Sequence, residues 1–223
     1  MRRFLFALGG LALAGPAIAA DLGSEPAPLE TPIYSPISAF NWAGGYLGIQ
    51  GGYDWNHATT PPDWSAQENG GIIGIYGGYN WQPASNWVFG VDASINFDWA
   101  RGSGSSPTLP GPTSNSAGPD WKGFLRGRLG YAWDRFMLYG SAGAAVMHYT
   151  ANITGPSGSG SATPWGWTVG LGAEMAITDN WVGRLDYAYQ NYGSFTLAGA
   201  APVGGTSVAV NSHTLMVGIA RKF

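Results

Sequence analysis

Residues 86–99, NWVFGVDASINFDW, alternate between large apolar residues and small or polar ones. The odd positions are apolar throughout: Trp87, Phe89, Val91, Ala93, Ile95, Phe97 and Trp99. Apart from Val88, the even positions carry Asn, Gly, Asp and Ser. Side chains of a β-strand point alternately to its two faces, so this stretch predicts a strand with one apolar and one polar face.

The same two-residue period recurs along the chain and predicts eight strands, at residues 42–55, 70–81, 86–99, 121–133, 135–149, 165–177, 180–192 and 211–223. Each segment is long enough to cross a bilayer as a tilted strand, which takes about 9–11 residues. The chain has 15 prolines, and none of them falls inside these segments. Because proline cannot donate to a strand ladder, its distribution supports the predicted boundaries.

Two all-β architectures fit this pattern, and they differ in the direction of the apolar face. A soluble sandwich or barrel buries that face, whereas an outer-membrane barrel exposes it to lipid and keeps the polar face inside. Charged residues make up only 10% of the chain, against roughly 25% in soluble domains. A soluble surface needs more charge than this polar face offers. We therefore predict an all-β fold, an eight-stranded antiparallel up-and-down transmembrane β-barrel.

Aromatic residues gather at both ends of the predicted strands, where the interfacial girdles of a membrane barrel lie. One end carries Trp81, Trp87, Trp133, Trp181 and Phe223, and the other carries Trp55, Trp99, Trp121, Tyr149, Trp165 and Tyr189. The connections after the second, fourth and sixth segments are short, and the others are long. Short turns face the periplasm in such barrels, so both ends of the barrel domain are expected on that side.

The chain divides into three predicted parts. Residues 1–20 combine Arg2 and Arg3 with an apolar run and a small-residue end, which predicts a secretory signal peptide. Residues 21–41 form a Pro-rich periplasmic leader, expected to be extended, and residues 42–223 form the barrel. The absence of cysteine excludes disulfides and thiolate catalysis, and the net charge of −3 argues against nucleic-acid binding.

Six charged residues form the one charge cluster that the sequence indicates on the inward face: Asp92, Arg126, Arg128, Glu174, Arg184 and Asp186. An unpaired ion in a confined interior costs several kcal/mol, so we expect these groups to pair or to stay hydrated. The turn at residues 178–180 sets Ile177 opposite Trp181, which places Glu174 across from Arg184, and the turn at Asp134 and Arg135 likewise sets Trp133 opposite Phe136. Eight strands enclose a space that side chains can just fill, and this favours a structural plug.

A second interpretation of the inward face is an ion-pair gate in a small, low-conductance pore. Inward glycines favour it because they could leave water-filled gaps; these are Gly48, Gly52, Gly74, Gly78, Gly90, Gly130, Gly170 and Gly172. A small porin for the diffusion of small solutes is therefore the alternative function.

Catalysis finds little support in the sequence. Ser212 and His213 are adjacent and so face opposite sides of a strand, which excludes a relay between them. His148 lies on the outward face near the rim, and His57 is expected in a loop without a partner at informative spacing. We predict no catalytic, cofactor-binding or metal-binding residue, and no cofactor.

Two glycine- and aromatic-rich stretches carry a family resemblance: WAGGYLGIQGGY at residues 42–53 and GIYGGYNW at residues 74–81. With them, the chain resembles the small outer-membrane β-barrels of alphaproteobacteria, porin-like surface antigens related to the opacity proteins and to the OmpA barrel. The C-terminal VGIARKF resembles the barrel-assembly signal, with Gly218 and the final Phe223 in place and Arg221 where an aromatic is usual.

That resemblance implies residence in the bacterial outer membrane, a structural role in the envelope and a role as a surface antigen. Its implied partners are outer-membrane lipids and, through the C-terminal strand, the barrel-assembly machinery. The long connections at residues 101–120, 150–163 and 193–210 are rich in Gly, Ser, Thr and Pro. Such composition is typical of exposed loops, so adhesion to a host surface or phage reception is a further, less favoured hypothesis.

Overall fold

The computed structural model describes residues 40–60, 64–83, 86–102, 116–152, 159–196 and 207–223. They form one sheet of nine strands: β1 (Gly44–Thr60), β2 (Trp64–Trp81), β3 (Trp87–Asp98), β4 (Ser116–Trp133), β5 (Phe136–Asn152), β6 (Ser159–Ala162), β7 (Trp165–Ala176), β8 (Trp181–Thr196) and β9 (Ser207–Lys222). The predicted signal peptide and residues 21–39 of the predicted leader lie outside the described residues.

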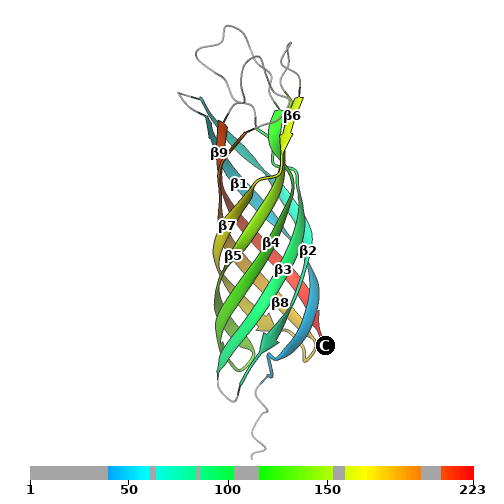
Figure 1. The fold of residues 1–223 in the computed structure, drawn as a ribbon. Coiled ribbons are helices and arrows are strands. Elements are labelled where there is room, and N and C mark those ends of the chain that lie inside the picture. Colours follow the sequence, from blue (N-terminus) through cyan, green and yellow to red (C-terminus); the bar gives the residue numbers. More distant parts are fainter. Residues whose placement is uncertain (1–39, 61–63, 84–85, 103–115, 153–158, 197–206) are drawn as a thin grey trace, which may run out of the picture. The chain divides into compact units, whose positions relative to one another are not determined.

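Eight of these strands close into an antiparallel barrel in which each strand pairs with its neighbour in the chain, and β9 pairs back onto β1 (Figure 1). The short β6 pairs only with the outer end of β5, where it continues the line of β7. The described residues contain no helix that is long and apolar enough to cross a membrane. The predicted fold class, an eight-stranded up-and-down barrel, is confirmed.

Tight turns set the register of the barrel. Asp134 adopts a φ of 50°, a left-handed conformation that Asp tolerates better than most residues, and this allows Trp133 to pair directly with Phe136. At the next such turn, Glu174 pairs with Arg184, as the sequence predicts. Because neighbouring residues of a strand face opposite sides, each turn fixes which side chains of the following strand point into the barrel.

The apolar face of the barrel points outward. Leu171 is 68% exposed, and Leu125 and Val217 are each 63% exposed, whereas Arg126 on the inner face is 1% exposed. This is the inverse of a soluble core and matches a barrel whose outer surface meets lipid. We call the part of the strands between the two aromatic rings the spanning band.

The strands continue beyond the outer aromatic ring, farther than the alternation of the sequence indicates. We call this part the outer extension; it comprises residues 56–60, 64–69, 116–120, 149–152, 191–196 and 207–212. His57, expected in a loop, lies here in β1 and pairs with Gln67 and Asn211. The loop prediction for His57 is therefore wrong, because backbone pairing persists where the outward side chains have become polar.

Three other local predictions are also wrong. Pro119 lies inside β4, at a register shift between Pro119 and Trp121, where a bulge removes the need for its missing N–H. Tyr149, assigned to the outer girdle, points inward and is buried. Trp42, predicted to open the first strand, precedes β1 and is buried as well. The strand starts only at Gly44, whose φ of +122° turns the chain.

Candidate functional site in the barrel lumen

The middle of the lumen is crossed by four paired ions, which we call the central network: Asp92, Arg126, Arg184 and Asp186. Arg126 donates to both oxygens of Asp92, Nε–Oδ1 at 3.1 Å and Nη2–Oδ2 at 2.9 Å, and from Nη1 to Asp186 Oδ1 at 3.0 Å. Arg184 Nη2 donates to Asp92 Oδ2 at 3.0 Å and to Asp186 Oδ2 at 2.9 Å. All four side chains are buried, so their charges are balanced in pairs where water is scarce.

Aromatic hydroxyls and rings complete the network. The Tyr139 hydroxyl donates to Asp186 Oδ2 at 2.5 Å. The Arg128 guanidinium lies 4.2 Å from the Tyr139 ring centroid, and that of Arg184 lies 4.5 Å from the Tyr76 ring centroid. Such contacts stabilise a cation most strongly where it is desolvated.

Below the network, towards the short turns, Arg128 and Glu174 form a two-pronged ion pair, Nη1–Oε1 and Nη2–Oε2, both 2.8 Å. Glu174 lies across from Arg184 in the backbone register, yet its partner is Arg128. Register fixes the face on which a side chain lies, and the long arginine side chains then reach past their nearest neighbours. The structure thus gathers all six predicted lumen charges; the register places Asp92 opposite Arg126, and the other contacts between strands reach beyond the directly opposed residues.

A second charge cluster lies above the central network and was missed by the sequence analysis, which described the six residues as the only cluster. Lys122 Nζ donates to Asp54 Oδ2 at 2.6 Å, to Asn56 Oδ1 at 2.8 Å and to Ser212 Oγ at 2.8 Å, and lies 3.4 Å from Asp98 Oδ2. All are buried. The sequence does contain a signal for this cluster: Lys122 precedes Arg126 by four residues and therefore lies on the same, inward face of the strand.

Inward glycines make room for neighbouring groups. A Cβ on Gly172 would lie 2.2 Å from Cζ of Tyr139, and one on Gly74 would lie 2.3 Å from Oδ1 of Asn96. A Cβ on Gly90 would lie 2.4 Å from Oδ1 of Asn80. At Gly172, Gly74 and Gly90, side chains of adjacent strands therefore occupy the space where the alternative interpretation expects water-filled gaps.

The periplasmic mouth is filled by Phe40 and Trp42, which we call the stopper. The indole N–H of Trp42 donates to the carbonyl of Asp134 at 3.1 Å, and the Trp42 backbone N–H donates to Gln82 Oε1 at 2.7 Å. Phe40 packs edge-on against Trp42, with ring centroids 4.9 Å apart. The stopper joins a buried cluster with Val88, Ala132, Met137, Tyr139, Ala176 and Val182. The stopper thereby joins the start of β1 to two turns, the one after β2 and the one between β4 and β5.

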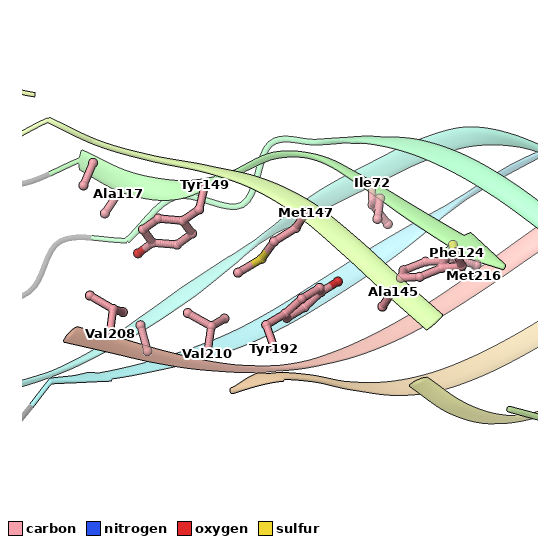
Figure 2. Close-up of a cluster of buried hydrophobic side chains, with 12 residues drawn as sticks. Ile72, Ala117, Phe124, Ala145, Met147, Tyr149, Tyr192, Val208, Val210 and Met216 are labelled. Atoms are coloured by element: carbon pink, nitrogen blue, oxygen red, sulfur yellow. The ribbon is translucent and has the colours of Figure 1, made fainter. Parts of the chain in front are cut away.

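The opposite end of the lumen is apolar. Figure 2 shows inward side chains of several strands converging there, among them Met147, Tyr149, Val208 and Val210. The hydroxyl of Tyr149 donates to the buried carboxylate of Glu68. The lumen is therefore occupied in layers: the stopper, the ion pairs, the Lys122 cluster and this apolar layer.

Comparison with known proteins decides the family. A model of the outer membrane protein β-barrel domain matches residues 32–223. The chain belongs to this family. It is 31% identical over 218 residues to the 25 kDa outer-membrane immunogenic protein of Brucella abortus, covering 93% of this chain and 91% of that protein.

Two further comparisons agree with this assignment. The 22 kDa outer membrane protein of Rhizobium leguminosarum bv. viciae is 32% identical over 161 residues, covering 70% of this chain and 67% of that protein. The crystal structure of Neisserial surface protein A covers 81% of this chain and 98% of its own, with a TM-score of 0.50 and 17% identity, which is a likeness of fold alone. The resemblance to alphaproteobacterial outer-membrane barrels and the outer-membrane location are confirmed.

In this outer-membrane β-barrel, Ser212 and Lys122 form a contact that resembles a serine–lysine pair in composition only. The Ser212 hydroxyl donates to Asp54 Oδ1 at 2.7 Å, and its residue is fully buried. Lys122 is fully buried as well, so both side chains are bonded within the lumen. His213 lies on the outer face, as the sequence predicts. In the described part of the chain, no three His, Cys, Asp or Glu side chains are grouped to hold a metal ion.

Proposed function

We propose that this protein is a structural barrel of the outer membrane that presents its loops as surface antigens and acts without catalysis. The observation that carries the proposal is the layered filling of the lumen. From the stopper to the apolar layer, side chains span the interior at each level and pair their charges with one another. Filling of this kind gives a rigid cylinder and supports a barrel without a continuous aqueous path through its described part.

The space that remains at the periplasmic end is small. A cavity of about 10 Å³ lies above the stopper, bordered by Tyr46, Tyr76 and Glu174 among others. This volume accommodates about one water molecule. Passage of a solute would therefore require the stopper and the ion pairs to move together.

Planar-bilayer recording tests the proposal against the porin alternative. We expect the refolded full chain to give a quiet baseline. The double variant Trp42→Ala/Arg126→Ala removes two layers and is the positive control for a conducting barrel. Heat-modifiable electrophoretic mobility verifies closure of both proteins. Steady unitary openings in the wild type that persist in a variant with a bulkier stopper, Phe40→Trp, would refute the closed barrel.

The antigen role is supported by the printed names of the Brucella relatives, which are outer-membrane immunogenic proteins. Its test is whether antibodies raised against the refolded barrel bind intact cells that express it. Cells that express a chain with residues 103–115 removed serve as the comparison. Binding only after permeabilisation would refute surface presentation.

The C-terminal strand is the part that we propose to contact the barrel-assembly machinery. Phe223 is 71% exposed at the periplasmic end of β9, and the Arg221 guanidinium lies 5.7 Å from its ring centroid. We expect Phe223→Ala to lower the amount of heat-modifiable barrel in cells while refolding in detergent stays unchanged. Equal loss in both settings would indicate a stability defect and refute a recognition role.

A further inference from the structure

All three histidines of the chain lie on the outer face at or next to the outer aromatic ring, His57 one outward position farther out than His213. His57 in β1, His148 in β5 and His213 in β9 point outward. Below each one, the next outward residue is apolar: Trp55, Val146 and Leu215. Above each one, it is polar: Thr59, Thr150 and Asn211. The histidines therefore mark the level at which the outer surface changes from apolar to polar, which is where lipid headgroups lie.

At His213 the neighbouring side chains form an ordered cluster, the β8–β9 patch: Tyr187, Tyr189, Asn191, Asn211 and His213. The Tyr187 hydroxyl lies 2.8 Å from His213 Nδ1. The rings of Tyr189 and His213 have centroids 5.0 Å apart. Asn211 Oδ1 accepts from Asn191 Nδ2 at 2.8 Å and from the Tyr189 hydroxyl at 3.2 Å. These bonds hold the polar groups of the patch in fixed orientations before any ligand binds.

The bonds leave two N–H groups of the patch without a protein acceptor. We assign Tyr187 as the donor to Nδ1 of His213, because a phenol hydroxyl on the lipid side needs an acceptor, and in that tautomer the imidazole hydrogen resides on Nε2. Asn211 uses its oxygen for its neighbours, which leaves its Nδ2 amide as a second donor. Among the described residues, neither His213 Nε2 nor Asn211 Nδ2 has a protein acceptor.

The chemistry of the patch selects its ligand. Two N–H donors match phosphate oxygens, and the patch itself holds no carboxylate that would repel them. The Tyr189 ring, which packs edge-on against Trp167 with centroids 5.5 Å apart, offers an aromatic surface for a sugar ring. We propose that the β8–β9 patch binds the phosphorylated sugar headgroup of an outer-leaflet glycolipid. The inference rests on the outer-membrane location and is independent of whether the lumen conducts.

Native mass spectrometry of the full-length barrel, released from nanodiscs, tests the proposal. The probe is bisphosphorylated lipid A, compared with the same lipid lacking both phosphates and with phosphatidylglycerol. We expect wild-type barrel to retain the phosphorylated glycolipid preferentially, and His213→Phe, which keeps a ring but has no N–H donor, to lower retention by about tenfold or more, the effect of one hydrogen bond to a charged group. Asn211→Ala is a second, independent variant in case His213→Phe fails to fold.

His148→Phe is the matched control, because His148 lies near the outer aromatic ring outside the patch, stacked on Trp121 and 3.0 Å from Thr163 Oγ1. We expect this control to retain lipid A as the wild type does. Equal losses in His148→Phe and His213→Phe, or no loss in either patch variant, would overturn the proposal. Equal retention of phosphatidylglycerol would reduce the patch to a general anion contact and overturn the assignment to a glycolipid.

Discussion

The spanning band and the outer extension are built from the same strands, yet they distribute apolar residues in opposite directions. On β9, Leu215 and Val217 point outward in the band, and Val208 and Val210 point inward in the extension. β1 and β9 keep their parity through both regions, whereas β4 and β8 shift theirs at bulges, between Pro119 and Trp121 and between Asn191 and Ser194. The solvent outside the barrel changes from hydrocarbon to water at the outer ring, and the sequence follows it. The extension thus resembles a small soluble barrel attached to a membrane one.

Among substitutions in the two regions, we expect one in the central network of the spanning band to reduce the free energy of unfolding most. Arg126→Met leaves Asp92 and Asp186 to share Arg184, so we expect a loss of about 3–5 kcal/mol in the free energy of unfolding, the cost of breaking a buried ion pair. Urea unfolding in lipid vesicles, followed by the heat-modifiable band, measures it.

Arg135→Met is the control for that substitution, because Arg135 pairs with Asp179 at 2.7 Å on the exposed periplasmic side. An exposed pair contributes about 0–1 kcal/mol. Comparable losses of unfolding free energy in Arg126→Met and Arg135→Met would show that the buried ion pairs of the central network stabilise the barrel no more than an exposed pair does.

A charge on the outer face of the spanning band should have the next largest effect. Val217 lies midway along the band on β9 and is largely exposed to the surroundings of the barrel. Val217→Lys is expected to cost about 2–4 kcal/mol, because a lysine near the bilayer midplane must leave water. Unfolding titrations in lipid vesicles measure this change in the free energy of unfolding, and a change near zero would mean that this face does not contact hydrocarbon.

A cavity in the outer extension should have a smaller and more local effect. Val210→Ala removes two methyl groups from the inward apolar layer, and we expect a loss of about 2 kcal/mol. Hydrogen exchange should rise in the outer ends of β1, β8 and β9 and stay unchanged in the spanning band. A uniform increase over all strands would show that the two regions unfold as one unit.

We expect the smallest change in the free energy of unfolding at an outward position of the outer extension on β9. Ala209→Lys places the same charge as Val217→Lys on the same face, eight residues away, where the surface meets water. We expect a change within about 0.5 kcal/mol in the same unfolding titration. A penalty equal to that of Val217→Lys would place the bilayer boundary beyond Ala209 and remove the distinction between the regions.

The sequence predicts the barrel well where one local rule decides the outcome. Alternation over residues 86–99 gives the strand and its lipid face, and the Asp134 turn gives the pairing of Trp133 with Phe136. It fails where residues from distant strands meet across the tilted lumen. The contact of Lys122 with Asp54 joins β4 to β1 and depends on the stagger of the closed barrel, which no local pattern encodes.

The ends of the strands were mispredicted for a different reason. Trp42 reads as the first residue of a strand because it continues the apolar alternation, but Gly44 allows the chain to turn and the indole to enter the mouth. Tyr149 reads as a girdle residue because tyrosines favour interfaces. Its inward parity follows directly from the Asp134 turn and was the better guide.

The seam between β1 and β9 has a consequence for biogenesis. The backbone N–H of Phe223 donates to the carbonyl of Gly45 at 2.9 Å, at the end of the ladder that joins β9 to β1. Ring closure must therefore wait until β9 has been synthesised. Until then β1 presents an unsatisfied edge that could recruit foreign strands, and a nascent chain needs that edge protected until β9 is available.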